Sequence, residues 1–380
     1  FATNEYMNYL LRTTDGGVSW DRVHLPDSFA TINNVHFYDS DTGWITGTTQ
    51  NWERYIIQTT DGGAAWEPLF LDSNMSIITT IAFPTTQTGF FGTREDYHFG
   101  LTRDGGHTWE VESYFYGYEE LFFLDENIGW MAGVYVGGGT VRKTTDGAVT
   151  WQDRVRRFEN GERFPYIYSI FFIDEHRGWI GGSNGTIAVS TDGGDTWSVQ
   201  YEETRGSGVD AIHFVNDKVG WGVGWGGAVY FTQNGGDDWE RKDFGTTSDL
   251  YDIQFVGPNH GWIVGNRGIL YRTTNNGGYP QPVSATRTPQ RVAPSQLSLN
   301  AVSGKPGSVE LRYSLSKPGR VTIDLYDLRG KRVEQVLNKP RGAGGDHTVR
   351  FSGGSGFYVA EIRVEHNGGV ISAVERVLVR

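Results

Sequence analysis

Short hydrophobic segments with alternating polar positions recur along the first 280 residues, and turns rich in Gly, Asp and Asn separate them. One unit contains four such segments, for example Asn34–Phe37, Gly43–Gly47, Tyr55–Thr59 and Ala65–Leu69. Alternation with a period of two is typical of strands that bury one face of a sheet. We name the four strands of a unit a to d in chain order. Four antiparallel strands within about 42 residues have the size of one blade of a β-propeller.

Two sequence motifs repeat with this unit. The first, Ser/Thr-x-Asp/Asn-Gly-x-x-x-Trp, lies at the turn between strands c and d. Its Asp or Asn recurs at intervals of 46, 43, 42, 46, 42 and 42 residues, as Asp15, Asp61, Asp104, Asp146, Asp192, Asn234 and Asn276. The copy at Asn276 lacks the Trp. In the second motif a Phe is followed seven residues later by an aromatic residue, as in Phe37/Trp44 and Phe172/Trp179. Seven copies predict a seven-bladed propeller.

The Asp and Asn residues of the first motif are expected to have a structural role. A side-chain oxygen at this position can accept N–H groups of its own turn, and the glycines that follow permit a positive φ. The amides at Asn234 and Asn276 could not replace a general acid or a nucleophile. We therefore predict a turn rather than a catalytic or calcium-binding role.

The two ends of the repeat region suggest how the ring closes. Phe1 lies 14 residues before Asp15, the same offset as between Phe90 and Asp104, so the sequence begins at strand b. The last unit has no Trp, and a Pro-rich stretch begins at Pro280. We expect an upstream segment to supply strand d of the last blade and strand a of the first, because closure removes free sheet edges.

Loop lengths distinguish the two faces of the predicted propeller. The spacings across the a–b and c–d turns are constant at seven and five residues. The spacings across the b–c and d–a loops vary from 13 to 17 and from 14 to 21 residues. Variation on one face commonly marks a binding side. Its candidate partner-binding residues are Trp52, Tyr114, Tyr116, Tyr118, Arg154, Arg156, Arg157, Arg163 and Trp225, since exposed Tyr, Trp and Arg anchor interfaces. Alternatively, these runs complete strands d and a, and the rest is solvated.

The C-terminal segment has a different organisation. Residues 280–296 are Pro-rich and predict an extended linker between a repeat domain at 1–279 and a second domain at 297–380. Seven alternating segments follow and predict a small immunoglobulin-like β-sandwich: Leu297–Ala301, Ser308–Leu315, Gly319–Asp327, Val333–Leu337, His347–Phe351, Gly356–Val364 and Gly369–Leu378.

Charge and composition narrow the function classes. The formal net charge is −12, but residues 1–280 hold 18 Lys and Arg against 37 Asp and Glu. Such an acidic domain is unsuited to nucleic acids or anionic bilayers. The sequence contains no Cys and no apolar run of 18 residues, so disulfides and a transmembrane helix are not expected. It shows no signal peptide, which indicates removal or a cytoplasmic chain.

The two repeated motifs resemble those of the Asp-box (BNR) repeat family, most closely the subgroup related to the photosystem II assembly and stability factor. The resemblance covers roughly residues 1–279. It implies a β-propeller in which the Asp-box is structural. Because the family also includes sialidases, the resemblance does not define an activity.

The C-terminal segment resembles the sorting domain of the type IX secretion system of Bacteroidetes-like bacteria. The resemblance rests on Val309–Leu315, Val321–Gly330, the Gly342–His347 turn, Gly356–Ile362 and Val377–Val379. The Asn-Pro usual at the family's first strand is replaced here by Ala293-Pro294-Ser295. The resemblance implies contact with the secretion machinery, export across the outer membrane and a location outside the cell or on its outer surface. A generic immunoglobulin-like module is the alternative.

The favoured function is a non-enzymatic interaction or scaffold protein. It would bind a protein or protein complex at the cell surface, or alternatively a glycan, through its b–c and d–a loops. No phosphate-binding loop, metal-ligand spacing or nucleotide fingerprint occurs, so we expect no cofactor and no metal.

The alternative function is a sialidase-like glycoside hydrolase or a glycan-binding lectin. Sialidase chemistry requires clustered arginines and carboxylates at the propeller axis. Candidate arginines are Arg12, Arg54, Arg94, Arg154 and Arg177, but no spacing among them marks a cluster. Arginines and carboxylates that converge at the axis would favour the hydrolase. A rim formed by Trp52, Trp225 and the Arg154–Arg163 loop would favour the interaction protein.

Overall fold

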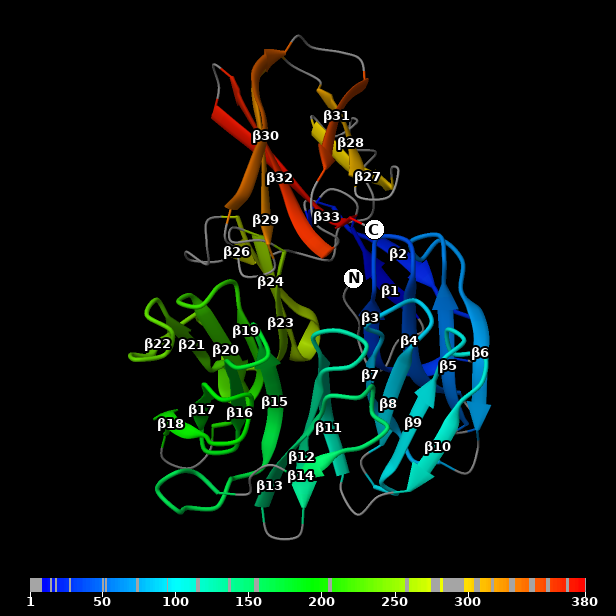
Figure 1. The fold of residues 1–380 in the computed structure, drawn as a ribbon, viewed down its shortest axis with the longest axis vertical. Coiled ribbons are helices and arrows are strands. Elements are labelled where there is room, and N and C mark those ends of the chain that lie inside the picture. Colours follow the sequence, from blue (N-terminus) through cyan, green and yellow to red (C-terminus); the bar gives the residue numbers. More distant parts are fainter. Residues whose placement is uncertain are drawn as a thin grey trace.

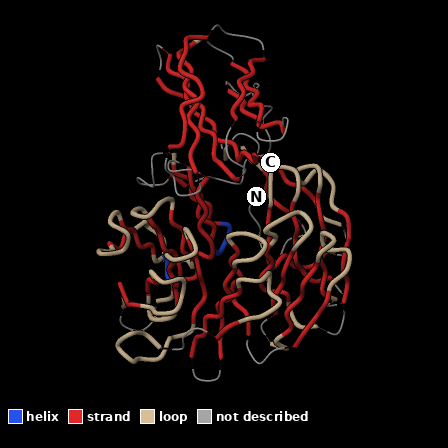
Figure 2. Tube along the Cα trace, in the orientation of Figure 1, coloured by secondary structure: helices blue, strands red, loops and turns tan. Residues whose placement is uncertain are grey.

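The fold was analysed in a computed structural model of the 380-residue chain. The structure describes residues 9–13, 16–17, 19–26, 29–49, 51, 53–72, 75–93, 95–113, 117–135, 138–153, 157–203, 207–256, 260–274, 281–282, 297–303, 308–315, 318–327, 332–341, 346–352, 356–366 and 369–379. Within these ranges the chain is all-β, with two short 3-10 helices, η1 (Trp225–Gly227) and η2 (Asn266–Gly268), drawn in blue in Figure 2. No helix among the described residues is long and apolar enough to cross a membrane.

The repeat region forms a series of antiparallel sheets whose strands follow one another in sequence. The first described sheet has two strands, β1 (Tyr9–Arg12) and β2 (Asp21–His24). Six four-stranded sheets follow. Their strands are β3 (Phe29–Phe37), β4 (Gly43–Thr49), β5 (Arg54–Thr59), β6 (Glu67–Asp72); β7 (Ile78–Ala82), β8 (Gly89–Thr93), β9 (His98–Thr102), β10 (Glu110–Ser113); β11 (Gly117–Phe123), β12 (Gly129–Tyr135), β13 (Gly138–Thr144), β14 (Gln152–Asp153); β15 (Ile167–Phe172), β16 (Gly178–Gly182), β17 (Ile187–Ser190), β18 (Ser198–Tyr201); β19 (Val209–Phe214), β20 (Gly220–Gly224), β21 (Val229–Thr232), β22 (Glu240–Lys242); and β23 (Leu250–Val256), β24 (His260–Gly265), β25 (Ile269–Thr273), β26 (Gln281–Pro282).

The sheets are arranged around a common centre. Each first strand, from β3 to β23, packs beside the first strand of the next sheet, while fourth strands such as β6, β18 and β22 lie at the periphery (Figure 1). The first and last sheets are also neighbours, because a Cβ on Gly17 would lie 2.6 Å from Nε1 of Trp262. Successive sheets therefore follow each other around the centre.

The last sheet corrects one sequence-based expectation. Its fourth strand, β26, pairs with β25 through Tyr271 and Arg272, so the chain itself supplies strand d at the start of the predicted linker. The expectation that an upstream segment supplies this strand was wrong. The strand lacks the Trp that marks the other copies. Its Pro282, which pairs with Tyr271, is tolerated because β26 is an edge strand. The position expected for strand a of the first blade lies outside the described residues.

Aromatic stacking joins neighbouring sheets. Trp130 on β12 stacks on Phe172 of the next sheet with a centroid distance of 3.6 Å and an interplanar angle of 7°. Trp44/Phe83, Phe90/Phe123 and Trp179/Phe214 repeat this contact at 3.6, 4.1 and 3.5 Å. A glycine before each aromatic residue is required by this packing, since a Cβ at Gly178 would lie 2.5 Å from the ring of Phe172. The two residues of the second sequence motif thus belong to consecutive intersheet contacts.

The C-terminal region consists of two sheets. One contains β27 (Leu297–Ser303), β28 (Ser308–Leu315) and β31 (Asp346–Ser352), and the other β29 (Gly319–Asp327), β30 (Arg332–Arg341), β32 (Gly356–His366) and β33 (Gly369–Val379). Both sheets contribute to one buried core, which includes Leu311, Tyr313 and Phe351 from the first and Ile323 and Ile362 from the second. The predicted strand positions agree closely with these elements.

The C-terminal sheets lie next to the last sheet of the repeat region (Figure 1). β33 contacts β23, and the charge of Glu361 on β32 acts on His260 at the start of β24. Burial lowers the pKa of His260, while Glu361 opposes this effect. Figure 2 shows the two regions in direct succession, with strands of both meeting at this junction.

Candidate functional site

The face that carries the a–b and c–d turns is held by one repeated hydrogen bond. In each case a glycine N–H of the c–d turn donates to a carbonyl of the a–b turn in the same sheet. The five donors and acceptors are Gly62 to Asp41, Gly105 to Gln87, Gly147 to Asn127, Gly193 to His176 and Gly235 to Lys218, at 2.7–3.1 Å. Such a fixed contact accounts for the constant length of both turns.

The carboxylates of this face are occupied by their own turns. Asp192 accepts the N–H of Thr196 at 2.9 Å, the Thr196 hydroxyl at 2.8 Å and the Ser190 hydroxyl at 2.8 Å. Burial would raise its pKa, but these hydrogen bonds lower it. Asp61, Asp104, Asp146 and Asn234 have the corresponding contacts. Asp15 and Asn276 lie outside the described residues. With their acceptor atoms used in this way, these side chains are unsuited to acid–base chemistry.

The b–c and d–a loops contact one another on the opposite face. The N–H of Glu203 in a d–a loop donates to the backbone carbonyl of Asn184 in a b–c loop at 2.9 Å. The N–H of Asn266 in a b–c loop donates to the backbone carbonyl of Asp249 in a d–a loop at 2.8 Å. Ser76, in the d–a loop between β6 and β7, contacts Asp96 in the b–c loop between β8 and β9. The two variable loops therefore lie together, as the spacing analysis predicted.

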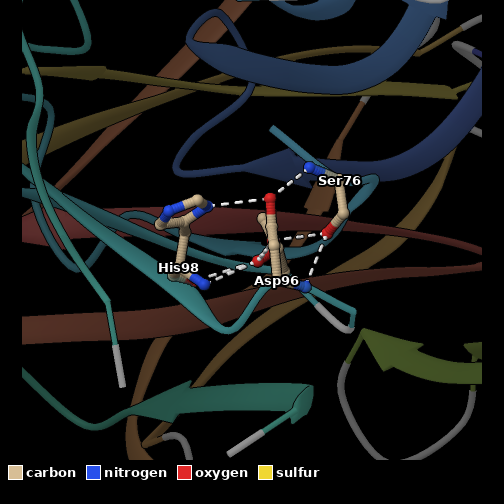
Figure 3. Close-up of polar contacts among 4 residues, drawn as sticks. Ser76, Asp96 and His98 are labelled. Atoms are coloured by element: carbon tan, nitrogen blue, oxygen red, sulfur yellow. Dashed lines mark hydrogen bonds and ion pairs between the residues drawn. The ribbon is translucent and has the colours of Figure 1, made fainter. Parts of the chain in front are cut away.

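Asp96 is the centre of a polar cluster in these loops (Figure 3). Its carboxylate accepts the N–H of Ser76 at 2.5 Å, the hydroxyls of Ser76 and Thr93 at 2.5 Å, and lies 2.8 Å from Nδ1 of His98. Burial would raise the pKa of Asp96, but the hydrogen bonds lower it to about 2. The carboxylate, rather than the imidazole, is central, so the arrangement is not that of a catalytic Ser-His-Asp triad. Its effect is to join the β6–β7 loop to the β8–β9 loop.

A second cluster of this face lies at the inner edge of the sheets, and we call it the aromatic–acidic patch: Glu120, Tyr168, Trp225, Tyr251 and Asp252. Trp225 is 39% exposed, and its ring lies 5.5 Å from that of Tyr168. The helix η1, which contains Trp225, contacts β23, where Tyr251 is 48% exposed. Because Trp and Tyr with an accessible ring are the residues that anchor interfaces, this patch is the candidate functional site.

The two carboxylates of the patch come from β11 and β23, which belong to different sheets. Burial raises the pKa of Glu120 to about 8, and the charge of Asp252 adds to this effect. The N–H of Ile170 donates to Oε2 of Glu120 at 3.0 Å and opposes it. The pKa of Asp252 is also raised by desolvation, although the Ile253 N–H opposes the shift. The two side chains therefore share one electrostatic environment near the centre of the array.

The residues predicted from sequence have different locations. Trp225 belongs to the patch. Arg157 and Arg163 are exposed, and their backbones form an isolated antiparallel β-bridge. The hairpin between them contacts the start of β18, because the N–H of Glu159 donates to the carbonyl of Trp197, the residue before that strand. The Arg157–Arg163 hairpin thus contacts the neighbouring sheet beside an Asp-box turn, not η1. Tyr118 lies in β11. The remaining candidates, Trp52, Tyr114, Tyr116, Arg154 and Arg156, lie outside the described residues.

Sequence reasoning missed the other members of the patch. Tyr168 and Tyr251 occupy the position of a β-bulge, where the register of the first strand shifts by one residue, and Glu120 and Asp252 follow the bulge. A bulge redirects side chains of an inner strand, and such irregularities frequently lie next to functional sites. The available signal was the fixed offset from the strand-end Phe: Tyr168 and Tyr251 precede Phe172 and Phe255 by four residues.

Two of the arginines considered for a hydrolase, Arg12 and Arg177, lie away from these carboxylates, whereas Arg94 and Arg154 are outside the described residues. Arg177 donates to the carbonyl of Gly235 at 3.2 Å and covers the ring of Trp179, while Arg12 acts on the pKa of Asp61. Both therefore lie at the Asp-box face. In the described ranges no group of three or more His, Cys, Asp or Glu side chains is placed to hold a metal ion.

Part of the repeat region is similar to known protein families. The family model of the photosynthesis system II assembly factor YCF48 matches residues 161–244 and 198–274. The photosystem II assembly lipoprotein Ycf48 of Synechococcus sp. (strain CC9902) is 34% identical over 86 residues. That segment covers 23% of this chain and 24% of the relative, so the match spans about a quarter of either protein.

Solved structures of similar fold include two of YCF48. YCF48 bound to D1 peptide has a TM-score of 0.55 at 18% identity and covers 92% of this chain and 97% of its own. YCF48 from Cyanidioschyzon merolae has the same TM-score and identity, with 77% and 95% covered. PorZ of Porphyromonas gingivalis, a surface component of the type-IX secretion system, has a TM-score of 0.50 at 12% identity and covers 94% and 54%. At these identities the likeness concerns the fold. With the family match, it identifies a BNR-type β-propeller in this chain.

Proposed function

We propose that this chain is a non-enzymatic interaction protein whose seven-bladed propeller binds a protein partner through its b–c and d–a loops. The observation that carries the proposal is the exposed ring of Trp225, held against Tyr168 on the face where loop length varies. The opposite face uses its carboxylates within its own turns. A solved structure of similar fold is that of YCF48 bound to D1 peptide, and it supports a polypeptide as the ligand class.

The proposal extends to location. The C-terminal sheets would form an immunoglobulin-like sorting domain that directs export by a type IX-like system to the cell surface. Deletion of residues 297–380 should then retain the protein inside a type IX-competent host. Surface labelling of intact cells checks this. Equal labelling of the full chain and the truncated chain would contradict a sorting role.

Binding is tested by native pull-down of the intact chain from its source envelope, followed by mass spectrometry. A stoichiometric protein that is retained by the wild type and lost with Trp225→Ala is the expected result. Asp217→Asn is the matched control, because Asp217 is exposed in an a–b turn of the opposite face. If no protein co-purifies, or if both variants retain it equally, this function is wrong.

One observation favours a second candidate, a glycoside hydrolase. Glu120 and Asp252 come from two sheets, and both have raised pKa values, as a general acid requires. Hydrolysis of sialyl and neutral glycoside substrates by the wild type, with loss in Glu120→Gln, would support the enzyme. A lectin would instead bind the same glycans without turnover.

A further inference from the structure

The face that carries the b–c and d–a loops concentrates exposed apolar side chains. Five of the seven exposed large hydrophobic side chains in the described repeat region lie on it: Ile77, Tyr97, Tyr166, Trp225 and Tyr251. The other two are Val111 on the peripheral strand β10 and Val149 in a box turn. Single exposed apolar residues are normal on a protein surface, but their concentration on one face is typical of an interaction surface.

The first group on this face consists of Ile77 and Tyr97, and we call it the Tyr97 anchor. The two side chains are 41% and 42% exposed. Each follows directly on a residue of the polar cluster in Figure 3, Ser76 or Asp96. Since the Asp96 carboxylate accepts both the N–H and the hydroxyl of Ser76 at 2.5 Å, the two loops are held together. Two apolar side chains from different loops are therefore presented side by side.

The backbone of Tyr97 indicates that its side chain has a role beyond folding. Tyr97 has a φ of 59°, in the left-handed region that favours Gly or Asn and that a bulky residue rarely occupies. Because the side chain is exposed, packing within the chain offers little compensation for this conformation. Residues held in such conformations cluster at binding sites, where the conformation serves the function.

The second group consists of Trp225 and Tyr168, and we call it the Trp225 anchor. The N–H of Trp225 donates to the Gly208 carbonyl at 3.3 Å, and the N–H of Gly226 donates to Oδ1 of Asp249 at 2.8 Å. The indole also rests on the backbone, because a Cβ on Gly208 would lie 3.0 Å from it. Both anchors are thus fixed by contacts between loops. A preorganised surface loses little entropy when a partner covers it.

The two anchors lie on either side of the centre of the sheets (Figure 1). The Tyr97 anchor belongs to the β7–β10 sheet, whereas Tyr168 lies in β15 and Trp225 in η1, which contacts β23. The first strands pack in the order β7, β11, β15, β19 and β23. The β11–β14 sheet therefore separates the anchors, and they form two distinct parts of one face.

The size of one anchor is too small for a stable complex. A fully covered aromatic side chain buries about 150–250 Å². Since the exposed aromatic residues of this face are only 39–48% accessible, one anchor offers on the order of 200 Å². A stable interface buries about 800 Å² on each protein. A partner that covers the Tyr97 anchor must therefore extend across the face, where the other exposed large hydrophobic side chains are Tyr166, Trp225 and Tyr251.

We infer that the loop face is the interface for one folded protein, which covers the centre of the sheets and contacts the Tyr97 anchor and the Trp225 anchor at the same time. The inference rests on the proposed function and specifies its partner class. Two rigid anchors at a fixed separation match a partner whose own surface is preformed, because neither side then loses much entropy on association. A short peptide would reach only one of them.

The test is site-specific photo-cross-linking with the full chain. One variant carries p-benzoylphenylalanine in place of Tyr97, a second in place of Trp225, and a third in place of the exposed Asp217 on the opposite face. Each is irradiated together with its source envelope, and mass spectrometry identifies the cross-linked peptides. We expect the first two variants to capture the same protein, at sites far apart in its sequence, and the third not to capture it.

The location of the cross-links in the partner decides between a folded protein and an extended segment. Ten extended residues span about 33 Å, so two cross-links within about ten residues of each other would mean an extended segment and would overturn the inference. Different proteins captured at the two positions would also overturn it.

Affinities measured with the purified partner provide an independent readout. Tyr97→Ala and Trp225→Ala should each weaken binding about tenfold, which corresponds to about 1.4 kcal/mol. The double variant should weaken it about hundredfold, because the effects of distant contacts add. Asp217→Asn should leave the affinity unchanged.

Tyr97→Gly separates binding from folding. Glycine adopts a positive φ readily, so the melting temperature of this variant should equal or exceed that of the wild type. Its affinity for the partner should nevertheless fall about tenfold, as in Tyr97→Ala. An unchanged affinity in Tyr97→Gly would show that the side chain does not contact the partner and would overturn the inference.

Failure of this inference can be told apart from failure of the proposed function. If the Trp225 position captures a protein and the Tyr97 position does not, the folded partner that spans both anchors is refuted while the interaction function stands. If neither position captures a protein, the interaction function itself is wrong.

Discussion

At the scale of single residues, the box turn depends on one side-chain acceptor that satisfies three donors. In the β15–β18 sheet, Asp192 receives the hydroxyls of Ser190 and Thr196 and one backbone N–H. The serine hydroxyl in turn accepts the N–H of Gly194 at 2.8 Å. An Asn in the same place preserves the acceptor, as Asn234 does with the N–H of Asp238 at 3.0 Å.

Asp192→Ala should therefore destabilise the protein by about 1 kcal/mol, because hydrogen bonds to a solvent-exposed turn are worth little more. Asp192→Asn should lose less than half of that amount. Chemical denaturation of the two variants and the wild type measures the difference. Equal losses for Ala and Asn would show that the charge, not the acceptor, stabilises the turn.

Asp96 gives a pH-dependent contribution at the same scale. Its pKa in the folded protein is about 2, compared with an ordinary value of 3.8, so the folded state favours the ionised form. This stabilisation is complete above the unfolded pKa and is lost as the pH falls from about 4 through 2. We expect about 2 kcal/mol more acid sensitivity in the wild type than in Asp96→Asn. Unfolding curves between pH 6 and 2 test this, and parallel curves would contradict it.

At the scale of strands, side chains of each sheet pack against the next sheet. Trp130 is fully buried, stacks on Phe172 and donates from Nε1 to the Gly193 carbonyl at 2.9 Å. The last contact reaches the box turn of the next sheet, so one side chain connects two repeated motifs across the interface between sheets.

Trp130→Ala should cost about 3–5 kcal/mol because it removes a large buried ring and leaves a cavity. Trp130→Phe keeps a stacking partner and should cost less, with the Gly193 carbonyl left without its donor. Urea unfolding followed by far-ultraviolet circular dichroism compares the two. A loss in Trp130→Phe as large as in Trp130→Ala would mean that the indole hydrogen bond dominates.

The strand arrangement was largely predictable because it is local and repeated. Periodic alternation and the constant positions of Phe, Gly and Trp located the strands of the β3–β25 region and of the C-terminal sheets. Two features were not predictable. The strand β26 has no motif of its own, and the patch combines residues of four sheets, whose proximity depends on the arrangement of the sheets around their centre rather than on sequence spacing. Trp225 was found because it is outside both motifs, whereas Tyr168 and Asp252 gave no comparable signal.

At the scale of the whole molecule, the two regions have separate cores and a polar junction. In the C-terminal sheets Asp324 is fully buried and accepts from Arg363 at 2.6 Å and from Gln335 at 3.1 Å. Glu361 beside it contacts Tyr326 and acts on His260 of the repeat region. Charge interactions thus link the two regions, in addition to the contact between β33 and β23.

Arg363→Ala should destabilise the C-terminal region by about 3 kcal/mol, because it leaves a buried carboxylate with reduced compensation. Differential scanning calorimetry of the full chain should show two transitions, of which only one moves in this variant. A shift of both transitions by the same amount would show that the regions unfold as one unit. Arg320→Ala, on the same strand as Asp324 but bonded to the exposed Asn338, is the control.

The separation of turn contacts and loop contacts onto opposite faces also has an evolutionary consequence. Substitutions and insertions in the b–c and d–a loops leave the Gly-to-carbonyl bonds and the box carboxylates untouched, so selection can change the loop face without selecting against folding. Among descendants of a common ancestor, the Asp-box face should retain its residues while the opposite face diverges in length and composition. Descendants that share a partner should be recognisable by a common set of residues at the inner ends of their first strands.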